Sequence, residues 1–91
     1  MVKVEFMAEL AALADAAQID LPGGETVLCV LSAASDQLNP GLKKRLFLAD
    51  GSFTDDVFIL VNGQHARYLE GLQTRIKAGD TITLIPFIEG G

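Results

Sequence analysis

Residues 25–38 read ETVLCVLSAASDQL, and this stretch decides the fold class. Its apolar residues recur three, four and seven positions apart, which gathers them on one face of a helix. The negative charge of Glu25 lies at the N-terminal end, where the helix dipole favours it. Asn39-Pro40-Gly41 ends the helix, because proline cannot continue the hydrogen-bond ladder and disfavours the α conformation in the residue before it. The stretch therefore predicts one amphipathic helix, whose buried face consists of Val27, Leu28, Leu31, Ala34 and Leu38.

Two strands are predicted before this helix. The apolar residues Val2, Val4 and Phe6 alternate with charged residues, which is the period-two pattern of a half-buried strand. A second alternation covers residues 18–21 and ends at Pro22-Gly23-Gly24, a sequence typical of a turn. We expect these two strands to pair as an antiparallel ribbon. The alanine-rich residues between them fit either a helical turn or an irregular crossing.

Several strands are predicted after the helix. Residues 57–61 form a continuous apolar run with β-branched and aromatic residues, which indicates a central strand covered on both faces. Asn62-Gly63 follows as a tight turn, and Ala78-Gly79-Asp80 is the turn into the last strand. The remaining expectations are a short element at residues 42–48, a hairpin turn at 49–52, a brief strand at 66–69 and an irregular link at 70–74.

This order of elements predicts an α+β fold in which a mixed sheet is covered on one face by a single main helix. Ubiquitin-like β-grasp folds have the same order. A chain of 91 residues allows one domain and no second core. We assign residues 1–87 to a β-grasp ubiquitin-like domain and residues 88–91 to a flexible C-terminal diglycine tail.

Composition and charge exclude several function classes. The net charge of −5 has the wrong sign for holding a phosphate backbone, so no nucleic-acid partner is expected. With one cysteine and one histidine, the chain lacks the parts of a zinc site or of a Cys/His nucleophile, and no metal site is predicted. No apolar run reaches the length of a membrane span and no secretion signal is recognised. We therefore expect no membrane partner and a cytoplasmic location.

Two local features have more than one interpretation. Cys29 lies in the apolar helix, and we interpret it as a small buried hydrophobe rather than a reactive thiol. The basic run Lys43-Lys44-Arg45 is interpreted as a solvated surface. The alternative for the basic run is a docking patch for an acidic partner.

The sequence ends in Gly90-Gly91, directly after an apolar run and Glu89. Glycine has no Cβ atom, so such a tail can extend into a narrow active site and present its carboxylate to another enzyme. The alternative is a frayed end, because glycine is common in disordered termini. Phe87 and Ile88 lie close enough to the tail to dock on a partner, and we expect Phe87 to be exposed. Arg67 and Arg75 are either steering charges for an acidic partner or ordinary surface cations.

The C-terminal third resembles the MoaD/ThiS family of ubiquitin-like sulfur carriers. The resemblance covers the last third closely and the whole chain in element order. Its most specific parts are the apolar strand ending in Asn62-Gly63, the Gly79-Asp80 turn, Pro86 in the final strand and the terminal Gly90-Gly91. Residues 69–74, LEGLQT, look more like the longer MoaD-like carriers than like the thiazole-pathway carriers.

The resemblance implies a carrier or co-substrate rather than an enzyme, with no catalytic residue and no bound cofactor of its own. A partner, an E1-like adenylyltransferase of the MoeB/ThiF type, uses ATP to adenylate Gly91, and a sulfur donor then leaves a thiocarboxylate there. Gly90 contributes access and reach. The expected acceptor is the large subunit of molybdopterin synthase, in the synthesis of the molybdenum or tungsten cofactor.

Three alternatives stay open at this point. The same carrier chemistry serves cysteine, thiamine or tRNA thiolation equally well. The activated tail also suits a protein modifier that forms isopeptide bonds to lysines. A β-grasp interaction module with an incidental glycine end is the third alternative, and it predicts that loss of Gly91 has no effect.

Overall fold

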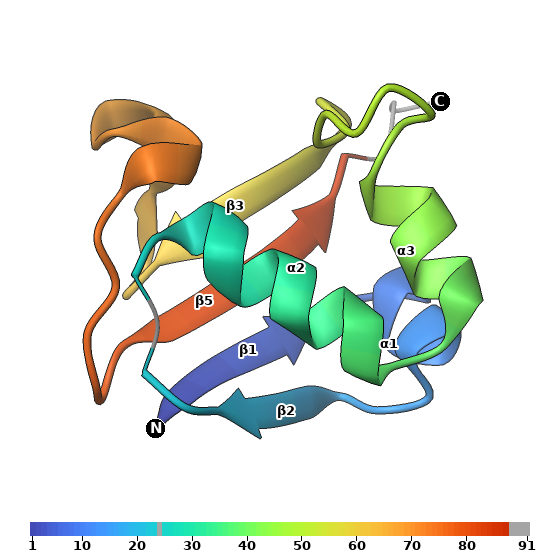
Figure 1. Ribbon diagram of the computed structural model, residues 1–91, viewed down its shortest axis with the longest axis horizontal. Helices are drawn as coiled ribbons and strands as arrows, with labels where there is room; N and C mark the ends of the chain where they lie inside the picture. Colours follow the sequence, from blue (N-terminus) through green and yellow to red (C-terminus); the bar gives the residue numbers. More distant parts are fainter. Residues whose placement is uncertain (24, 88–91) are drawn as a thin grey trace.

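The computed structural model describes residues 1–23 and 25–87, which form a twisted sheet with helices on one face (Figure 1). The long helix α2 lies across the sheet, and the shorter α3 and α1 lie beside its C-terminal end. In chain order the elements are β1 (Val2–Phe6), α1 (Glu9–Ala14), β2 (Gln18–Leu21), α2 (Val27–Gln37), α3 (Pro40–Leu46), β3 (Val57–Val61), β4 (Gln64–His65), the 3-10 turns η1 (Ala66–Tyr68) and η2 (Gly71–Gln73), and β5 (Thr81–Pro86).

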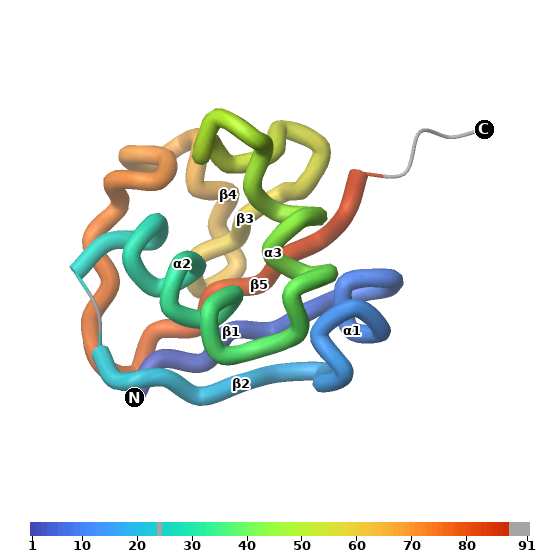
Figure 2. Tube along the Cα trace, turned by 45° about the vertical axis from the view of Figure 1, so that its right-hand side comes forward, coloured from blue at the N-terminus to red at the C-terminus, as the bar shows by residue number. Residues whose placement is uncertain are grey.

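The sheet is mixed, and its strand order is β2-β1-β5-β3-β4. β1 and β2 pair antiparallel with Val4 opposite Ile19, so the predicted ribbon is confirmed. β1 and β5 pair in parallel at the centre, with Val4 opposite Ile82. β5 also pairs antiparallel with β3, and β3 with the short β4. The first and last strands of the chain therefore hold the middle of the sheet together, as Figure 2 shows.

One core lies between the sheet and the helices. Alternate residues of β1, β3 and β5 face it, because side chains of a strand point to opposite faces in turn. Val4, Leu31 and Leu84 are all fully buried there. Burying a side chain of this kind contributes about 1.5–3 kcal/mol. The α+β prediction with a mixed sheet is confirmed, and the arrangement is that of a β-grasp fold.

The helices differ in one respect from the sequence prediction. α2 begins after Thr26, whose side chain accepts a hydrogen bond from the backbone N–H of Cys29 at 3.2 Å. Pro40 ends α2 as expected, but it also begins α3, because Asn39 caps the new helix and proline fits the first helical position. α2 is therefore the single main helix, as predicted, and two short helices, α1 and α3, cover the sheet beside it. No helix in residues 1–23 and 25–87 is long and apolar enough to cross a membrane.

Four local predictions were wrong. β3 is an interior strand between β5 and β4, as predicted, but it is buried on one face only, since Phe58 and Leu60 are half-exposed on the other face. The strand expected at residues 66–69 is the 3-10 turn η1, and the extended pair is Gln64–His65. The hairpin expected around residues 49–52 is reduced to a single bridge between Phe47 and Phe53.

The fourth correction concerns Cys29, which is exposed rather than buried. Cys29 lies on the side of α2 that faces away from the core, where Val27, Val30 and Leu31 are buried. Its thiol lies 3.8 Å from a carboxylate oxygen of Glu25.

Candidate functional site

The candidate site is the end of β5, where the chain leaves the sheet towards the tail residues 88–91. Phe87 is the last described residue, and 49% of its surface is exposed, as expected from the sequence. Its backbone N–H donates to the carbonyl oxygen of Asp56 at 2.7 Å, which extends the β3–β5 ladder by one residue. The tail therefore begins from a backbone position that is still held by the sheet.

The ring of Phe87 is the first of four rings in edge-on contact. It meets Phe58 at 5.5 Å between centroids, Phe58 meets His65 at 5.2 Å, and His65 meets Tyr68 at 6.1 Å. We call these four residues the aromatic row. Edge-to-face contacts of this kind stabilise the rings relative to one another, by about 0.5–1.5 kcal/mol per pair. The row is thus an ordered surface that starts at the tail.

The aromatic row lies on the face of the sheet that the helices leave open. Phe58 alternates with the buried Val57 and Ile59 along β3, and Ile85 lies opposite Phe58 on β5. Leu60, Thr83 and Ile85 are half-exposed on this face. Tyr68, at the far end of the row, is 74% exposed. Exposed aromatic side chains next to a sheet are a common composition for protein interfaces.

His65 has a fixed ring orientation within the row. Its Nδ1 atom accepts the backbone N–H of Arg67 at 3.2 Å, so the neutral ring carries its proton on Nε2. Within residues 1–23 and 25–87 the buried Nε2 atom has no hydrogen-bond partner. The contact with Phe58 on one side and Tyr68 on the other makes His65 the link between β3 and η1.

The predicted docking residues separate in the structure. Arg67 lies two residues after His65, donates its backbone N–H to the His65 ring and is exposed beside the aromatic row. Arg75 is exposed on another part of the surface. Its backbone forms a bridge with Thr26, the residue that caps the N-terminal end of α2. Ile88, Gly90 and Gly91 lie outside the described residues. Sequence reasoning missed Phe58, His65 and Tyr68, because only the β3–β4 register and the turn after β4 bring them together.

The turns that carried the family resemblance meet at the opposite end of β5. The side-chain amide of Asn62 donates to Asp80 Oδ1 at 3.0 Å, and its oxygen accepts the N–H of Thr81 at 2.9 Å. Asp80 Oδ2 accepts the N–H of Lys77 at 2.9 Å. The hydrogen bond from Lys77 and that from Asn62 lower the pKa of Asp80. These residues fix the β3–β5 register and the turn before β5, so their role is structural.

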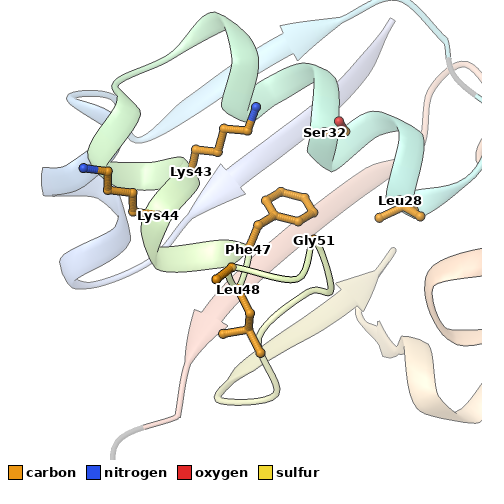
Figure 3. A pocket seen from close by; sticks show the side chains of 8 residues that line it. Leu28, Ser32, Lys43, Lys44, Phe47, Leu48 and Gly51 are labelled. Atoms are coloured by element: carbon orange, nitrogen blue, oxygen red, sulfur yellow. The ribbon is translucent and has the colours of Figure 1, made fainter.

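The basic run on α3 is only partly a solvated surface. Lys43 and Lys44 are exposed, whereas Arg45 is half-buried and contacts Asp56 and Glu9. Lys43 and Lys44 border a hollow of about 580 Å³. Figure 3 shows Phe47 pointing into this hollow, with Leu28 of α2 and Leu48 of the following loop at its sides. None of its lining residues belongs to the aromatic row.

The described part of the chain contains no cluster of metal-ligating side chains. No group of three His, Cys, Asp or Glu side chains lies close enough to hold a metal ion there. The arrangement that the structure does offer is an apolar surface leading to a glycine-ended tail, which suits recognition by another protein.

Comparisons with known proteins show which family this chain resembles. A profile of the ThiS family matches residues 4–91. A protein of Archaeoglobus fulgidus, named as a candidate sulfur carrier, is 35% identical over 48 residues, which span 53% of this chain and 54% of that protein. The matched segment thus covers about half the length of this relative.

Two solved structures cover nearly the whole chain. The small archaeal modifier protein 1 of Methanosarcina acetivorans is 33% identical, with a TM-score of 0.87 over 99% of this chain and 95% of that one. The CysO protein of Amycolatopsis orientalis, solved in complex with BexX, is 26% identical with a TM-score of 0.84 over 100% of both chains. The chain therefore belongs to the ThiS family of ubiquitin-like sulfur carrier proteins.

Proposed function

We propose that this chain carries sulfur as a thiocarboxylate on Gly91, after a partner enzyme has adenylated that residue. The observation that carries the proposal is the Gly90-Gly91 pair, four and five residues after the end of β5, in a chain of the ThiS family. The acid/base chemistry and the ATP belong to the partner. The chain itself supplies the reacting carboxylate and the surface by which it is recognised.

The chemistry follows from the poor reactivity of a carboxylate. In the first step the Gly91 carboxylate attacks the α-phosphate of ATP, and pyrophosphate leaves. Sulfide then attacks the carbonyl carbon of the adenylate, and AMP leaves with the C–O bond electrons. With a persulfide donor the product is an acyl disulfide, and a thiol must reduce it to release the thiocarboxylate. The sulfur is then held in a nucleophilic and transferable form.

We propose the aromatic row as the surface that docks on the adenylating enzyme. The row begins at Phe87, so a partner that covers Phe58 and Tyr68 also receives the tail. Aromatic residues in a desolvated interface contribute a large share of binding energy. The cation of Arg67 at the edge of the row favours a partner whose matching surface is acidic.

A mass measurement tests the carrier chemistry. The protein is incubated with ATP, an E1-like adenylyltransferase from the same cells and a sulfide donor, and is then weighed intact. We expect one oxygen to be exchanged for sulfur, with release of pyrophosphate. A variant that lacks Gly91 and a reaction without ATP are the matched controls. An unchanged mass together with no pyrophosphate would contradict the proposal.

As the finer proposal, the sulfur passes to the large subunit of molybdopterin synthase. Purified thiocarboxylated carrier is mixed with that subunit and its pterin substrate, and formation of the dithiolene is measured. A carrier that transfers sulfur instead to an enzyme of cysteine, thiazole or tRNA thiolation would reject this assignment while leaving the carrier chemistry intact.

A second candidate function is protein modification through an isopeptide bond from Gly91 to lysine. The observation that favours it is the 33% identity over nearly the whole chain with a structure named as a small archaeal modifier protein. Glu89 offers a direct test, since a protease that cleaves after glutamate leaves only Gly-Gly on the acceptor lysine. Cells that lack the chain provide the control. Absence of chain-dependent Gly-Gly lysines would reject this function.

A further inference from the structure

Arg45, in the last turn of α3, joins three segments that are distant in sequence. Its Nη1 donates to Asp56 Oδ1 at 2.8 Å, and its Nη2 donates to Glu9 Oε1 of α1 at 3.2 Å. The Arg45 side chain is 21% exposed, against 56% for Lys43 on the same helix. The carboxylates of Asp56 and Glu9 are 53% and 58% exposed, so water screens these contacts mainly from the carboxylate side. The hydrogen bond that Arg45 donates to Asp56, followed by the one it donates to Glu9, raises the pKa of Arg45.

Asp56 is held a second time by Thr54. The Thr54 hydroxyl donates to Asp56 Oδ1 at 2.6 Å, and the N–H of Thr54 donates to the carbonyl of Leu46 at 2.7 Å. Thr54 is 8% exposed, so this turn is packed against the end of α3. The hydrogen bond from Thr54 and that from Arg45 lower the pKa of Asp56. The short segment before β3 is thus tied to the end of α3 by two hydrogen bonds, from Arg45 and to Leu46, and is braced internally by the bond from Thr54 to Asp56.

The backbone of Asp56 holds the root of the tail. Its carbonyl accepts the N–H of Phe87 at 2.7 Å. On the other side of β5 the last bond is that from Met7 N–H to the carbonyl of Leu84 at 3.0 Å. Pro86 has no N–H. Within residues 1–23 and 25–87, Phe87 is therefore the only residue after Ile85 that can donate a backbone hydrogen bond.

We propose that Arg45 and Asp56 are positioning residues, which fix where the sulfur-carrying tail leaves the body. The proposal rests on the proposed function and deepens it. The partner grips the aromatic row, and the tail must place Gly91 in an active site at a fixed distance from that row. Movement of the tail root relative to Phe58 lowers the fraction of docked molecules whose carboxylate is correctly placed.

This role predicts a separation of two kinetic constants. Loss of the Arg45–Asp56 contact loosens only Phe87 of the aromatic row and leaves Phe58, His65 and Tyr68 in place, so KM of the carrier for the adenylating enzyme changes little. The rate of adenylation within the complex falls, because fewer docked tails are aligned. A general loss of folding would instead affect both constants.

The first test is amide hydrogen exchange by NMR in the full chain. Arg45→Met and Asp56→Asn are compared with Lys43→Met. Lys43 is on the same helix as Arg45, and its substitution breaks a 2.8 Å ion pair with Asp36 of α2. The internal reference is the backbone N–H of Asn62, which donates to the carbonyl oxygen of Thr81 at 2.8 Å, at the other end of the β3–β5 pair. We expect the backbone N–H of Phe87 to exchange at least about tenfold faster in the first two variants, while that of Asn62 exchanges at an unchanged rate. The reason is that Asp56, whose carbonyl accepts the Phe87 N–H, loses the charged hydrogen bond from Arg45.

The second test measures pyrophosphate release with the adenylating enzyme. For Arg45→Met and Asp56→Asn we expect kcat to fall about tenfold while KM changes by less than about threefold. Arg45→Lys restores part of kcat, because a lysine keeps the charge beside Asp56 but lacks the fork that also reaches Glu9. For Lys43→Met we expect the same kcat and KM as for the chain without substitutions.

Three outcomes would overturn the positioning role. The first is a Phe87 exchange rate in Arg45→Met within about twofold of the unmodified chain, because Arg45 then does not hold the root. The second is faster exchange with unchanged kcat, because the root is then held without effect on activation. The third is an unmodified chain that is not adenylated. This last result also overturns the proposed function, and a Phe87 exchange rate that still depends on Arg45 would then identify a purely structural anchor.

Discussion

Single residues of the aromatic row differ in how much they contribute to the fold. Tyr68 is 74% exposed and contacts His65 only through one edge-on pair, so its removal has little effect on the core. We predict that Tyr68→Ala raises KM for the adenylating enzyme about tenfold, as loss of an aromatic interface residue does. The free energy of unfolding changes by less than about 0.5 kcal/mol.

A matched control for this prediction is Leu48→Ala. Leu48 is 52% exposed but lies at the hollow between α2 and α3, away from the row. Adenylation kinetics together with urea unfolding compare the two variants. Equal KM values for Tyr68→Ala and Leu48→Ala would mean that the partner does not dock on the row.

Asp80 provides a pH-dependent prediction at the same scale. The hydrogen bonds from Lys77 and Asn62 lower its pKa, so the folded state prefers the ionised form. The resulting stability is complete above the ordinary pKa of an aspartate, about 4, and is lost as pH falls through the lower pKa of the folded state. We predict that Asp80→Asn lowers the free energy of unfolding by about 1 kcal/mol at pH 7.

The difference between Asp80→Asn and the unmodified chain should shrink as the pH falls from neutral towards 3 and below. Urea unfolding at a series of pH values measures it. A difference that is constant over this range would show that the charge of Asp80 is not what stabilises the turn.

The residue scale also shows what the sequence reveals about the site. Phe87 was found because it precedes the diglycine, and its exposure follows from the end of the strand alternation. Phe58 was missed, because in a continuous apolar run the parity that faces solvent is not visible. His65 and Tyr68 were missed because η1 was read as a strand. Arg45 was read as a solvated cation, since its partners Glu9 and Asp56 are far away in sequence.

Among the elements, the β3–β4 hairpin depends most clearly on one local conformation. Asn62 and Gly63 both have positive φ, 51° and 85°, as a type I′ turn requires. A Cβ atom at Gly63 would meet no atom within 4 Å, so alanine there is strained only through its backbone. We predict that Gly63→Ala lowers the free energy of unfolding by about 1 kcal/mol.

Gly23→Ala is the control for this prediction. Gly23 is also exposed in a loop, and a Cβ there would lie 3.8 Å from the nearest backbone atom, which is ordinary contact. Its φ is not in the positive range. Thermal unfolding of both variants separates the effect of the turn from that of losing a glycine. An equal loss in both would show that the turn conformation is not the cause.

The elements were predictable from sequence where one period dominates. β1, β2 and α2 have clear periods; the two strands have the predicted bounds, and the helix is shorter than predicted by two residues at its start and one at its end. α3 is not predicted by the sequence pattern, because Pro40 indicates the end of α2 but can equally be the first residue of a capped helix, as it is here. β4 has two residues, which is too few for any period to be read. Their formation depends on contacts with β3 and α2 that sequence does not show.

At the scale of the whole molecule, we propose that the folding unit ends at Phe87. The core residues of the described range, from Val2 to Leu84, surround one interior, and Phe87 at the end of that range is tied to the sheet by its backbone N–H. We predict that a chain ending at Phe87 unfolds at the same urea concentration as the full chain and is not adenylated. A clearly lower midpoint would mean that residues 88–91 are part of the fold.

The parallel pairing of β1 with β5 has a consequence for biosynthesis. The hydroxyl of Thr83 donates to the carboxylate of Glu5 at 3.0 Å across 78 positions of sequence. Contacts of such separation form late, because a long loop must close before they are rewarded. A nascent polypeptide therefore cannot complete its sheet until the final strand has left the ribosome. We expect prematurely terminated products to expose β1 and be degraded, so that they never compete with intact carriers for the activating enzyme.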